Sequence, residues 1–213
     1  MFGGAGNDVY FADNAGDLAI ENANEGSDTV FSTAHFRLSA NVENLVLQGT
    51  ADLQAGGNSL NNTLQGNAGN NILDGDAGAD LMFGGAGNDV YFVDNAGDLV
   101  FENANEGTDA VFSTVSYTLT ANVETLVLQG GGNLSGTGNA LANSIAGNSG
   151  DNVLDGGAGF DALTGGAGND TFVSHAGQAN GDTVVDFIGN GAAAGDALQF
   201  VGFGTAAQGA TFT

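Results

Sequence analysis

Short apolar groups alternate with glycine- and asparagine-rich stretches along most of the chain. In GNAGNNILD (66–74), GDAGADLMF (75–83) and GGAGNDVYF (84–92), six turn-forming residues precede three residues suited to an extended segment. Successive side chains of a strand point to opposite faces, so the middle residue of each group can point inward. That residue is apolar in every unit, namely in Leu64, Leu73, Met82, Tyr91, Val100, Ile145, Leu154, Leu163 and Phe172. One unit cannot bury its apolar residue alone, so the units must stack.

The units recur in register, which predicts the fold class. Four consecutive nonapeptides occupy residues 57–92 and four more occupy 138–173, within a longer repeat that aligns residues 2–82 with 83–163. Two turns and two short strands would close one coil, and coils would stack. We therefore predict an all-β parallel β-roll, or β-solenoid, built from nonapeptide repeats. We expect the roll to span residues 1–173 and a closing segment to span 174–213.

Two parts of the chain depart from the nine-residue rhythm. Residues 93–137 keep rung-like apolar groups but lose the glycine spacing of the turns. We expect this part to continue the solenoid without regular metal sites. The segments 32–44 and 113–125 interrupt the rhythm, and we expect both to bulge outward.

The net charge adds a condition for folding, because this apolar chain is also very acidic. Its 213 residues include 25 acidic residues and one base, Arg37, for a formal net charge of −24. Self-repulsion opposes the compact state, so folding calls for cations. The same charge argues against nucleic acid and anionic membrane surfaces as partners. No apolar run is long enough for membrane insertion.

The sixth position of each unit carries the candidate metal ligands. It is occupied by Asn62, Asn71, Asp80, Asp89, Asp98, Asn143, Asn152, Asp161 and Asp170. Because consecutive units alternate sides, we expect the sixth positions of units n and n+2 to be neighbours, with Asn71 beside Asp89. Carboxylates and turn carbonyls form an all-oxygen donor set, which suits Ca²⁺. Zinc, copper and iron are disfavoured, since the chain has no cysteine and 2 histidines.

The nonapeptides resemble a known repeat. GGAGNDVYF, GGAGFDALT and GGAGNDTFV fit the pattern G-G-x-G-x-D-x-U-x of RTX (repeats-in-toxin) hemolysin-type calcium-binding proteins. This resemblance implies a right-handed parallel β-roll with several Ca²⁺ ions in the turns between units n and n+2. The implied side-chain ligands are Asp8, Asp80, Asp89, Asp161 and Asp170, to which the sixth-position pattern adds Asp98. The implied carbonyl ligands belong to turn residues Gly75, Ala77, Gly84, Ala86, Gly87, Gly156, Ala158, Gly159, Gly165 and Ala167.

Some candidate turns depart from the pattern. Asn71 and Asn152 replace the aspartate with a neutral ligand, so their turns are expected to be weaker sites or empty. Near the end of the chain, Asp182, Asp186 and Asp196 are candidates for a final site.

The sequence gives little support for catalysis. No Ser-His-Asp or Cys-His arrangement is recognisable, no cofactor-binding motif stands out, and His35 and His175 have no recurring partner. We therefore expect a protein that is not an enzyme, with both histidines in surface or packing roles.

Aromatic residues at the ninth position are less easily explained. Phe83, Phe92 and Phe101, followed by Phe112, would point away from the core. We expect the bulging segments to cover them. Lateral self-association of rolls is the alternative.

The leading functional hypothesis is a calcium-binding module that folds on Ca²⁺ binding outside a bacterial cell. RTX resemblance implies type I secretion and attachment to a longer chain. Two alternatives stay open: a stalk or adhesin repeat of a surface protein, and the accessory C-terminal tail of a secreted enzyme such as a protease, lipase or alginate epimerase.

Overall fold

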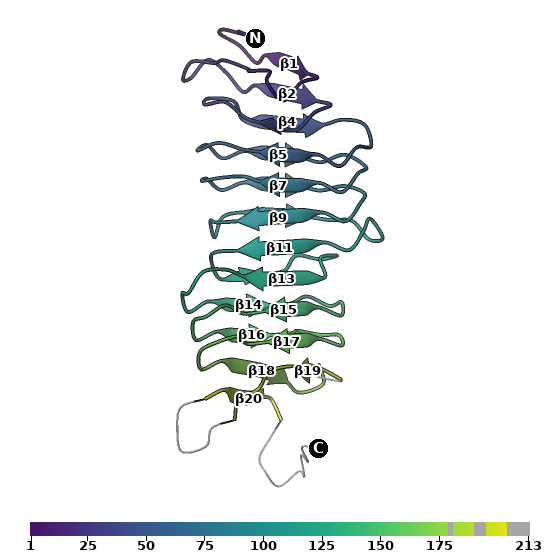
Figure 1. Cartoon of the computed structure of the whole chain (residues 1–213), viewed down its shortest axis with the longest axis vertical. Helices are drawn as coiled ribbons and strands as arrows, with labels where there is room; N and C mark the ends of the chain where they lie inside the picture. The colour runs from purple at the N-terminus through teal and green to yellow at the C-terminus, as the bar shows by residue number, and fades with distance from the viewer. Residues whose placement is uncertain (179–180, 190–194, 204–213) are drawn as a thin grey trace.

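The chain winds into an elongated stack of short strands (Figure 1). The structure is a computed structural model that describes residues 1–178, 181–189 and 195–203, and these residues contain no helix. The all-β solenoid predicted from the repeats is therefore confirmed. Its strands are β1 (Val9–Ala12), β2 (Thr29–Ser32), β3 (Phe36–Arg37), β4 (Asn44–Leu47), β5 (Gln54–Gly56), β6 (Thr63–Gln65), β7 (Ile72–Asp74), β8 (Leu81–Phe83), β9 (Val90–Val93), β10 (Leu99–Phe101), β11 (Ala110–Ser113), β12 (Tyr117–Thr118), β13 (Thr125–Leu128), β14 (Ser135–Thr137), β15 (Ser144–Ala146), β16 (Val153–Asp155), β17 (Ala162–Thr164), β18 (Thr171–His175), β19 (Thr183–Val184) and β20 (Ala197–Val201).

Strands that follow each other in the chain belong to different faces of the solenoid over most of its length. One face is a 6-stranded sheet in the order β1-β2-β4-β6-β8-β10, followed along the axis by a 5-stranded sheet in the order β12-β14-β16-β18-β20. The other face is a 9-stranded sheet that runs from β3 through the odd-numbered strands to β19. Pairing is parallel, and Met82 lies opposite Leu64 on one side and Val100 on the other. One coil is therefore two nonapeptides.

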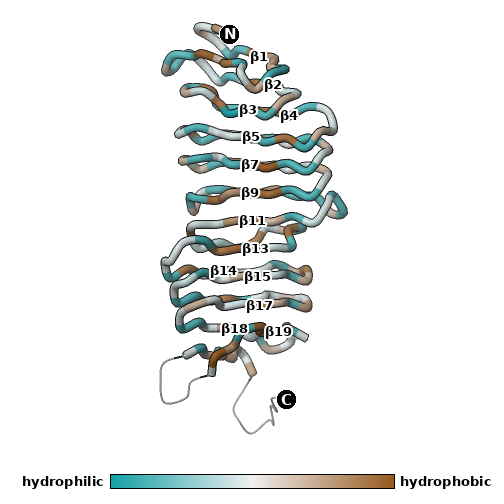
Figure 2. The backbone as a smooth tube through the Cα atoms, viewed as in Figure 1, coloured by the Kyte–Doolittle hydropathy of each residue, from teal (hydrophilic) through white to brown (hydrophobic). Residues whose placement is uncertain are grey.

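The core is a thin column between the two faces. Leu64, Leu73 and Met82 are fully buried, as are Tyr91 and Val100, and the other predicted middle residues are at most 2% exposed. Hydrophobic colour lies along the strands and hydrophilic colour is frequent in the turns (Figure 2). The inward position predicted from the nonapeptide is thus correct in every unit. Burial of these side chains drives the stacking, because each coil shields the apolar residues of its neighbours.

Equivalent strands of the two long repeats lie on opposite faces. Val9–Ala12 (VYFA) belongs to the 6-stranded sheet, whereas its counterpart Val90–Val93 (VYFV) belongs to the 9-stranded sheet. The long repeat of 81 residues equals nine nonapeptide lengths, an odd number of half-coils. Each repeat therefore exchanges the two faces, and a position returns to its own face only after two repeats.

The segments 32–44 and 113–125 do not bulge outward, so that prediction was wrong. Residues 36–37 form β3, which pairs with β5, and Phe36, Leu38 and Val42 are buried in the core. In the second copy, β12 pairs with β14 in the same way, and Tyr117, Leu119 and Val123 are buried. In each segment the alternate apolar side chains are buried in the core column, although the segment does not follow the nine-residue repeat.

The phenylalanines at the ninth position point outward, but they do not form one row. Phe83 and Phe101 stack with ring centroids 4.7 Å apart on the 6-stranded sheet. Phe92 and Phe112 stack at 5.7 Å on the 9-stranded sheet. Phe101 stays 42% exposed and Phe92 36%, so the expectation that neighbouring segments cover them was also wrong. Alternation of the units separates the pairs onto two faces.

The expected closing segment, residues 174–213, is described only in part. Within it, β19 pairs with β17, and β20 pairs with β18. Residues 179–180, 190–194 and 204–213 lie outside the described residues. Among the described residues, no helix has the length and apolar character needed to cross a membrane.

Candidate metal sites in the turns

A ladder of hydrogen bonds joins the sixth positions along each edge of the solenoid. The main-chain N–H of Asn71 donates to Asp89 Oδ1 at 2.6 Å, and that of Asn152 donates to Asp170 Oδ1 at 2.8 Å. Each bond spans 18 residues, the length of one coil. The structure therefore places the sixth positions of units n and n+2 side by side, as the spacing predicts.

The second oxygen of the same aspartates has no partner. Five buried Oδ2 atoms in the described chain lack any hydrogen bond, and they belong to Asp8, Asp80, Asp89, Asp161 and Asp170. These are the five aspartates that the resemblance to RTX repeats implies as ligands. A buried carboxylate oxygen without a donor is costly, so such an atom calls for a cation or a proton.

Glycine at the first position of the turn leaves room beside each free oxygen. A Cβ atom on Gly75 would meet Asp80 Oδ2, and one on Gly84 would meet Asp89 Oδ2. Gly156 and Gly165 stand in the same relation to Asp161 and Asp170. The free oxygen thus lies in a cradle that a larger residue would fill. Carboxylate and backbone oxygens are the donors that Ca²⁺ prefers, so these turns fit that ion.

Burial and crowding of acidic groups make the charged form of these side chains unfavourable. Burial, with smaller contributions from Asp98 and other acidic neighbours, raises the pKa of Asp80 to about 6 against the hydrogen bond from Asn62. Burial and Asp109 raise the pKa of Asp89 to about 7. The pKa values of Asp161 and Asp170 are also raised, mainly by burial. A bound cation would reverse this penalty by compensating the charge.

Turns with asparagine at the sixth position satisfy their own polar groups. Asn62 Oδ1 accepts a hydrogen bond of 2.7 Å from the N–H of Asn58, and its Nδ2 donates to Val42 O at 3.1 Å. Asn58 Nδ2 also donates to Val42 O, and to Ser39 O, at 2.7 Å. The turns of Asn71, Asn143 and Asn152 have similar side-chain hydrogen bonds. In these turns, N–H groups thus satisfy the side-chain oxygen at the sixth position, whereas in the aspartate turns the free oxygen would need a cation.

Comparison with known families decides the nature of the repeat. The chain matches the RTX calcium-binding nonapeptide repeat in 4 copies, over residues 1–18, 56–91 and 137–178. These nonapeptides are RTX repeats. A search of curated proteins gives no match to the chain. All five aspartates with an unpaired Oδ2 lie within the matched RTX segments.

Several other candidate ligands of the RTX turns are engaged by the backbone. Asp98 Oδ1 accepts from the N–H of Asp80, and its Oδ2 accepts from Asp94 and Asn95. Asp186 accepts from the N–H groups of Gly165 and Gly166, both at 2.8 Å. Asp182 accepts from Asp161 at 3.1 Å, and Asp196 from Asp170 at 3.0 Å and from Ile188 at 2.8 Å. Asp182 and Asp196 therefore continue the ladder, whereas Asp186 binds the main chain of the turn that begins at Gly165, and a final site at these three aspartates stays a prediction.

The position of some of the predicted carbonyl ligands can be given relative to the glycine turns. The carbonyl oxygens of Gly75 and Gly84 lie over Gly57 and Gly66, which open the asparagine turns one coil earlier. Those of Gly156 and Gly165 lie over Gly138 and Gly147 in the second array. The carbonyl oxygen of Gly87 lies over Gly107. All of these carbonyls, and those of Ala77, Ala86, Ala158, Gly159 and Ala167, stay predicted ligands.

Two acidic clusters were missed by reasoning from the nonapeptide pattern. Carboxylate oxygens of Asp89, Glu102 and Asp109 all lie within 4.8 Å of one another, and so do those of Asp8, Glu21 and Asp28. Glu102 and Asp109 belong to residues 93–137, where the sequence predicts no regular metal site. The recurring ENANEG motif at 21–26 and 102–107 was the available signal.

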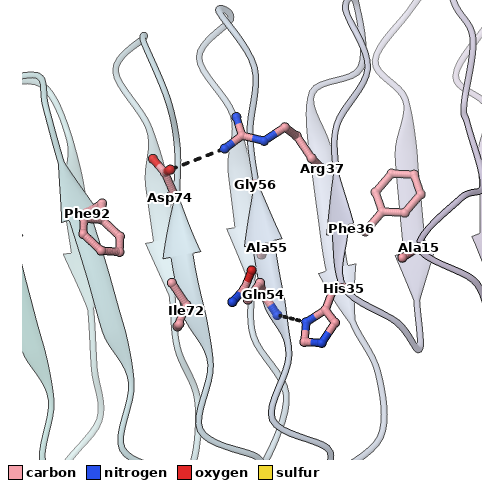
Figure 3. A pocket seen from close by; sticks show the side chains of 10 residues that line it. All are labelled: Ala15, His35, Phe36, Arg37, Gln54, Ala55, Gly56, Ile72, Asp74 and Phe92. Atoms are coloured by element: carbon pink, nitrogen blue, oxygen red, sulfur yellow. Dashed lines mark hydrogen bonds and ion pairs between the residues drawn. The ribbon is translucent and has the colours of Figure 1, made fainter.

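The groove in Figure 3 lies away from these turns, on the outer face of β3, β5, β7 and β9. Arg37, the single Lys or Arg of the chain, reaches over β5 to Asp74 at 3.5 Å and also contacts Asp76. His35 Nδ1 accepts a hydrogen bond of 3.0 Å from the N–H of Gln54. His175 Nε2 lies 2.9 Å from Asp155 Oδ2 on the preceding coil. Both histidines thus take part in contacts between neighbouring coils.

Proposed function

We propose that this RTX solenoid is a calcium-driven folding module of a larger secreted bacterial protein. The observation that carries the proposal is the set of five buried Oδ2 atoms without a partner, each next to a turn glycine. RTX repeats are typical of secreted bacterial proteins, which meet high Ca²⁺ concentrations outside the cell. In the calcium-poor cytosol, the chain with its net charge of −24 would stay unfolded and exportable.

Coupling of ion binding to folding follows from the position of the carboxylates. A bound Ca²⁺ supplies the positive charge that offsets their desolvation. Asp80 and Asp89 come to lie in closed turns only when the coils stack, so the unfolded chain offers no equivalent site. A ligand that binds only the folded state adds about 1.4 kcal/mol per site for each tenfold excess over Kd. Several such sites together would match the ~5–15 kcal/mol stability of a typical domain.

The proposed ligands follow the division between aspartate and asparagine turns. Side-chain oxygens would come from Asp8, Asp80, Asp89, Asp161 and Asp170, and carbonyl oxygens from turn residues of the same edge. The Asn71 and Asn152 turns would stay free of metal, because amide hydrogen bonds already satisfy them. Residues 1–173 would form the roll, with 174–213 closing its last coil.

Calcium titration of the chain followed by circular dichroism tests the proposal. We expect coil in a chelator and β structure at millimolar Ca²⁺, with a much weaker response to Mg²⁺, which demands a smaller shell and keeps its waters. Equilibrium dialysis would count the bound ions. A chain that is equally folded with and without Ca²⁺ would contradict the proposal.

A spacer function is the second candidate, supported by the shape of the solenoid. The coils add along one axis (Figure 1), so further 81-residue copies would lengthen the rod without changing its width. Small-angle scattering should show a rod with Ca²⁺ and an expanded coil in chelator. In the full-length gene, many such copies would favour the stalk, whereas an upstream hydrolase domain would favour the tail of a secreted enzyme.

A further inference from the structure

A cluster of three carboxylates lies where the first RTX array ends. Asp89 and Asp109 are 1% exposed and Glu102 is 9% exposed. The N–H of Asp89 donates to Asp109 Oδ1 at 2.7 Å, which continues the edge ladder. The hydroxyl of Tyr91 donates to Glu102 Oε1. Carboxylates from three successive segments of the chain therefore share one buried space.

Two oxygens of this cluster are buried and have no hydrogen-bond partner. They are Asp89 Oδ2 and Glu102 Oε2. A Cβ atom on Gly84 would meet Asp89 Oδ2, Glu102 Oε1 and the Tyr91 hydroxyl together, so these groups converge beside that glycine. With Arg37 paired to Asp74 and Asp76, the single Lys or Arg of the chain does not compensate them. A hard cation with oxygen ligands fits this space.

We propose that Asp89, Glu102 and Asp109 form a Ca²⁺ site of a second kind, in which Asp89, the aspartate of the Gly84 turn, is joined by two carboxylates from outside the RTX repeats. The proposal rests on the calcium binding inferred above and extends it to residues outside the RTX match, which ends at residue 91 and resumes at 137. Glu102 follows Gly84 by one coil length and so replaces the first-position glycine of a regular turn. Its side chain adds a carboxylate where the RTX pattern has only backbone. More anionic ligands bind Ca²⁺ more tightly, so this site fills before the turns of Asp80, Asp161 and Asp170, which lack such a glutamate.

The same cluster recurs in the first long repeat, which argues against an accidental grouping. Asp8, Glu21 and Asp28 occupy equivalent positions, and the N–H of Asp8 donates to Asp28 Oδ1 at 2.8 Å. Both carboxylate oxygens of Glu21 are buried without a partner, as is Asp8 Oδ2. A Cβ atom on Gly3 would meet Glu21, Asp8 and the Tyr10 hydroxyl, as at Gly84. Each 81-residue repeat therefore carries one such site.

Tyrosine-sensitised terbium luminescence reports on these sites selectively. The chain has 3 tyrosines and no tryptophan, and Tyr10 and Tyr91 each lie in one of the two clusters. Tb³⁺ prefers the same oxygen ligands as Ca²⁺ and is excited by a tyrosine close to it. In a Tyr117→Phe background, only the two cluster tyrosines can sensitise the ion.

Isosteric removal of one carboxylate is the decisive test. In the Tyr117→Phe background, Glu102→Gln should abolish about half of the sensitised emission and remove one bound Ca²⁺, because two equivalent three-carboxylate sites become one. Glu21→Gln should act equally, and the double variant should lose nearly all the emission. Glu106→Gln is the matched control, since it removes the same charge from the same turn outside the cluster and its amide can still accept the hydrogen bonds of Asn103. That control should keep both the emission and the ion count.

Three results would overturn the inference. The first is unchanged emission and ion count in Glu102→Gln with calcium-induced β structure intact, which leaves the folding proposal standing. The second is an infrared band of a protonated carboxylic acid that persists at saturating Ca²⁺ in the parent and disappears in Glu102→Gln, since a proton would then replace the metal. The third is unchanged sensitised emission in Tyr91→Phe. This variant keeps every carboxylate, so it can be used even if Glu102→Gln fails to fold. Failure of the folding proposal looks different, because the parent chain would neither bind Ca²⁺ nor gain β structure.

Discussion

The main-chain N–H of Asp80 donates a 3.0 Å hydrogen bond to Oδ1 of Asp98, one coil away. Asp80 uses its own Oδ1 in the same way, to accept from Asn62 at 2.6 Å. Its Oδ2 is left buried and unpaired. One carboxylate oxygen therefore holds the coils together and the other is free for a cation, so structural and metal-binding roles can be separated by substitution.

Asp80→Asn should weaken calcium binding without breaking the ladder. The amide oxygen can still accept from the N–H of Asn62, and Asn71 and Asn152 show that the sixth position accommodates asparagine as a buried residue. Loss of the anionic ligand should raise the Ca²⁺ midpoint of folding by roughly tenfold, or about 1.4 kcal/mol. Circular dichroism during a Ca²⁺ titration measures this midpoint. An unchanged midpoint would exclude Asp80 as a ligand.

Gly75→Ala should weaken calcium binding by filling the space beside Asp80 Oδ2, without changing any charge. The added methyl would meet Asp80 Oδ2 and fill the space beside it. We expect one ion fewer in equilibrium dialysis and a higher Ca²⁺ midpoint. Gly132→Ala is the matched control, because its Cβ would come no closer than 3.9 Å to Leu134. Equal effects of the two substitutions would indicate a general loss of backbone freedom.

Acidification should stabilise the metal-free solenoid and weaken calcium binding. Folded-state pKa values of about 6 for Asp80 and about 7 for Asp89 lie above the ordinary value of 3.8. A raised pKa means that the folded state holds protons more tightly, so stability is greatest below pH 4 and is lost as the pH rises through 6 to 7. Dialysed, metal-free chain should show more β structure at pH 5 than at pH 8. Protons compete with Ca²⁺, so its affinity should be lower at pH 6 than at pH 8. The opposite pH trend in either measurement would refute this interpretation.

Core truncation should be far more damaging than truncation of the adjacent outward side chain. Leu154 is fully buried, whereas Val153 on the same strand is 41% exposed. Leu154→Ala should cost about 2–5 kcal/mol in the free energy of unfolding. Val153→Ala should cost roughly 0.5 kcal/mol or less. Urea unfolding at saturating Ca²⁺ compares them, and equal losses would mean that the column is not the main source of stability.

Lateral association through the stacked phenylalanines stays a prediction. Phe101, which is 42% exposed, stacks on the half-buried Phe83 on one face, so a second chain could cover this aromatic pair. Phe101→Ser should lower any concentration-dependent association seen in sedimentation and leave the calcium-induced β structure unchanged. A parent chain that stays monomeric at high concentration would remove the case for association.

Much of the fold follows from the nonapeptide itself. Met82 and Tyr91 are apolar at the middle of their units, and both are fully buried where stacking places them. The same spacing places Asn71 beside Asp89. At residues 32–44 the spacing departs from nine, and the predicted outward bulge is wrong because the solenoid continues through this irregular segment. Phe36 and Leu38 instead keep their inward alternation and hold that segment in the column.

By itself, the sequence determined the coil of two nonapeptides, the identity of the inward side chains and the five aspartates of the RTX turns, because each depends on a short period repeated in register. Only the tertiary structure decided which carboxylates meet. Glu102 joins Asp89 and Asp109 through stacking of coils that the nonapeptide pattern does not describe. It also decided that Phe92 and Phe101 stay exposed, since the segments expected to cover them pack their own apolar side chains into the core instead.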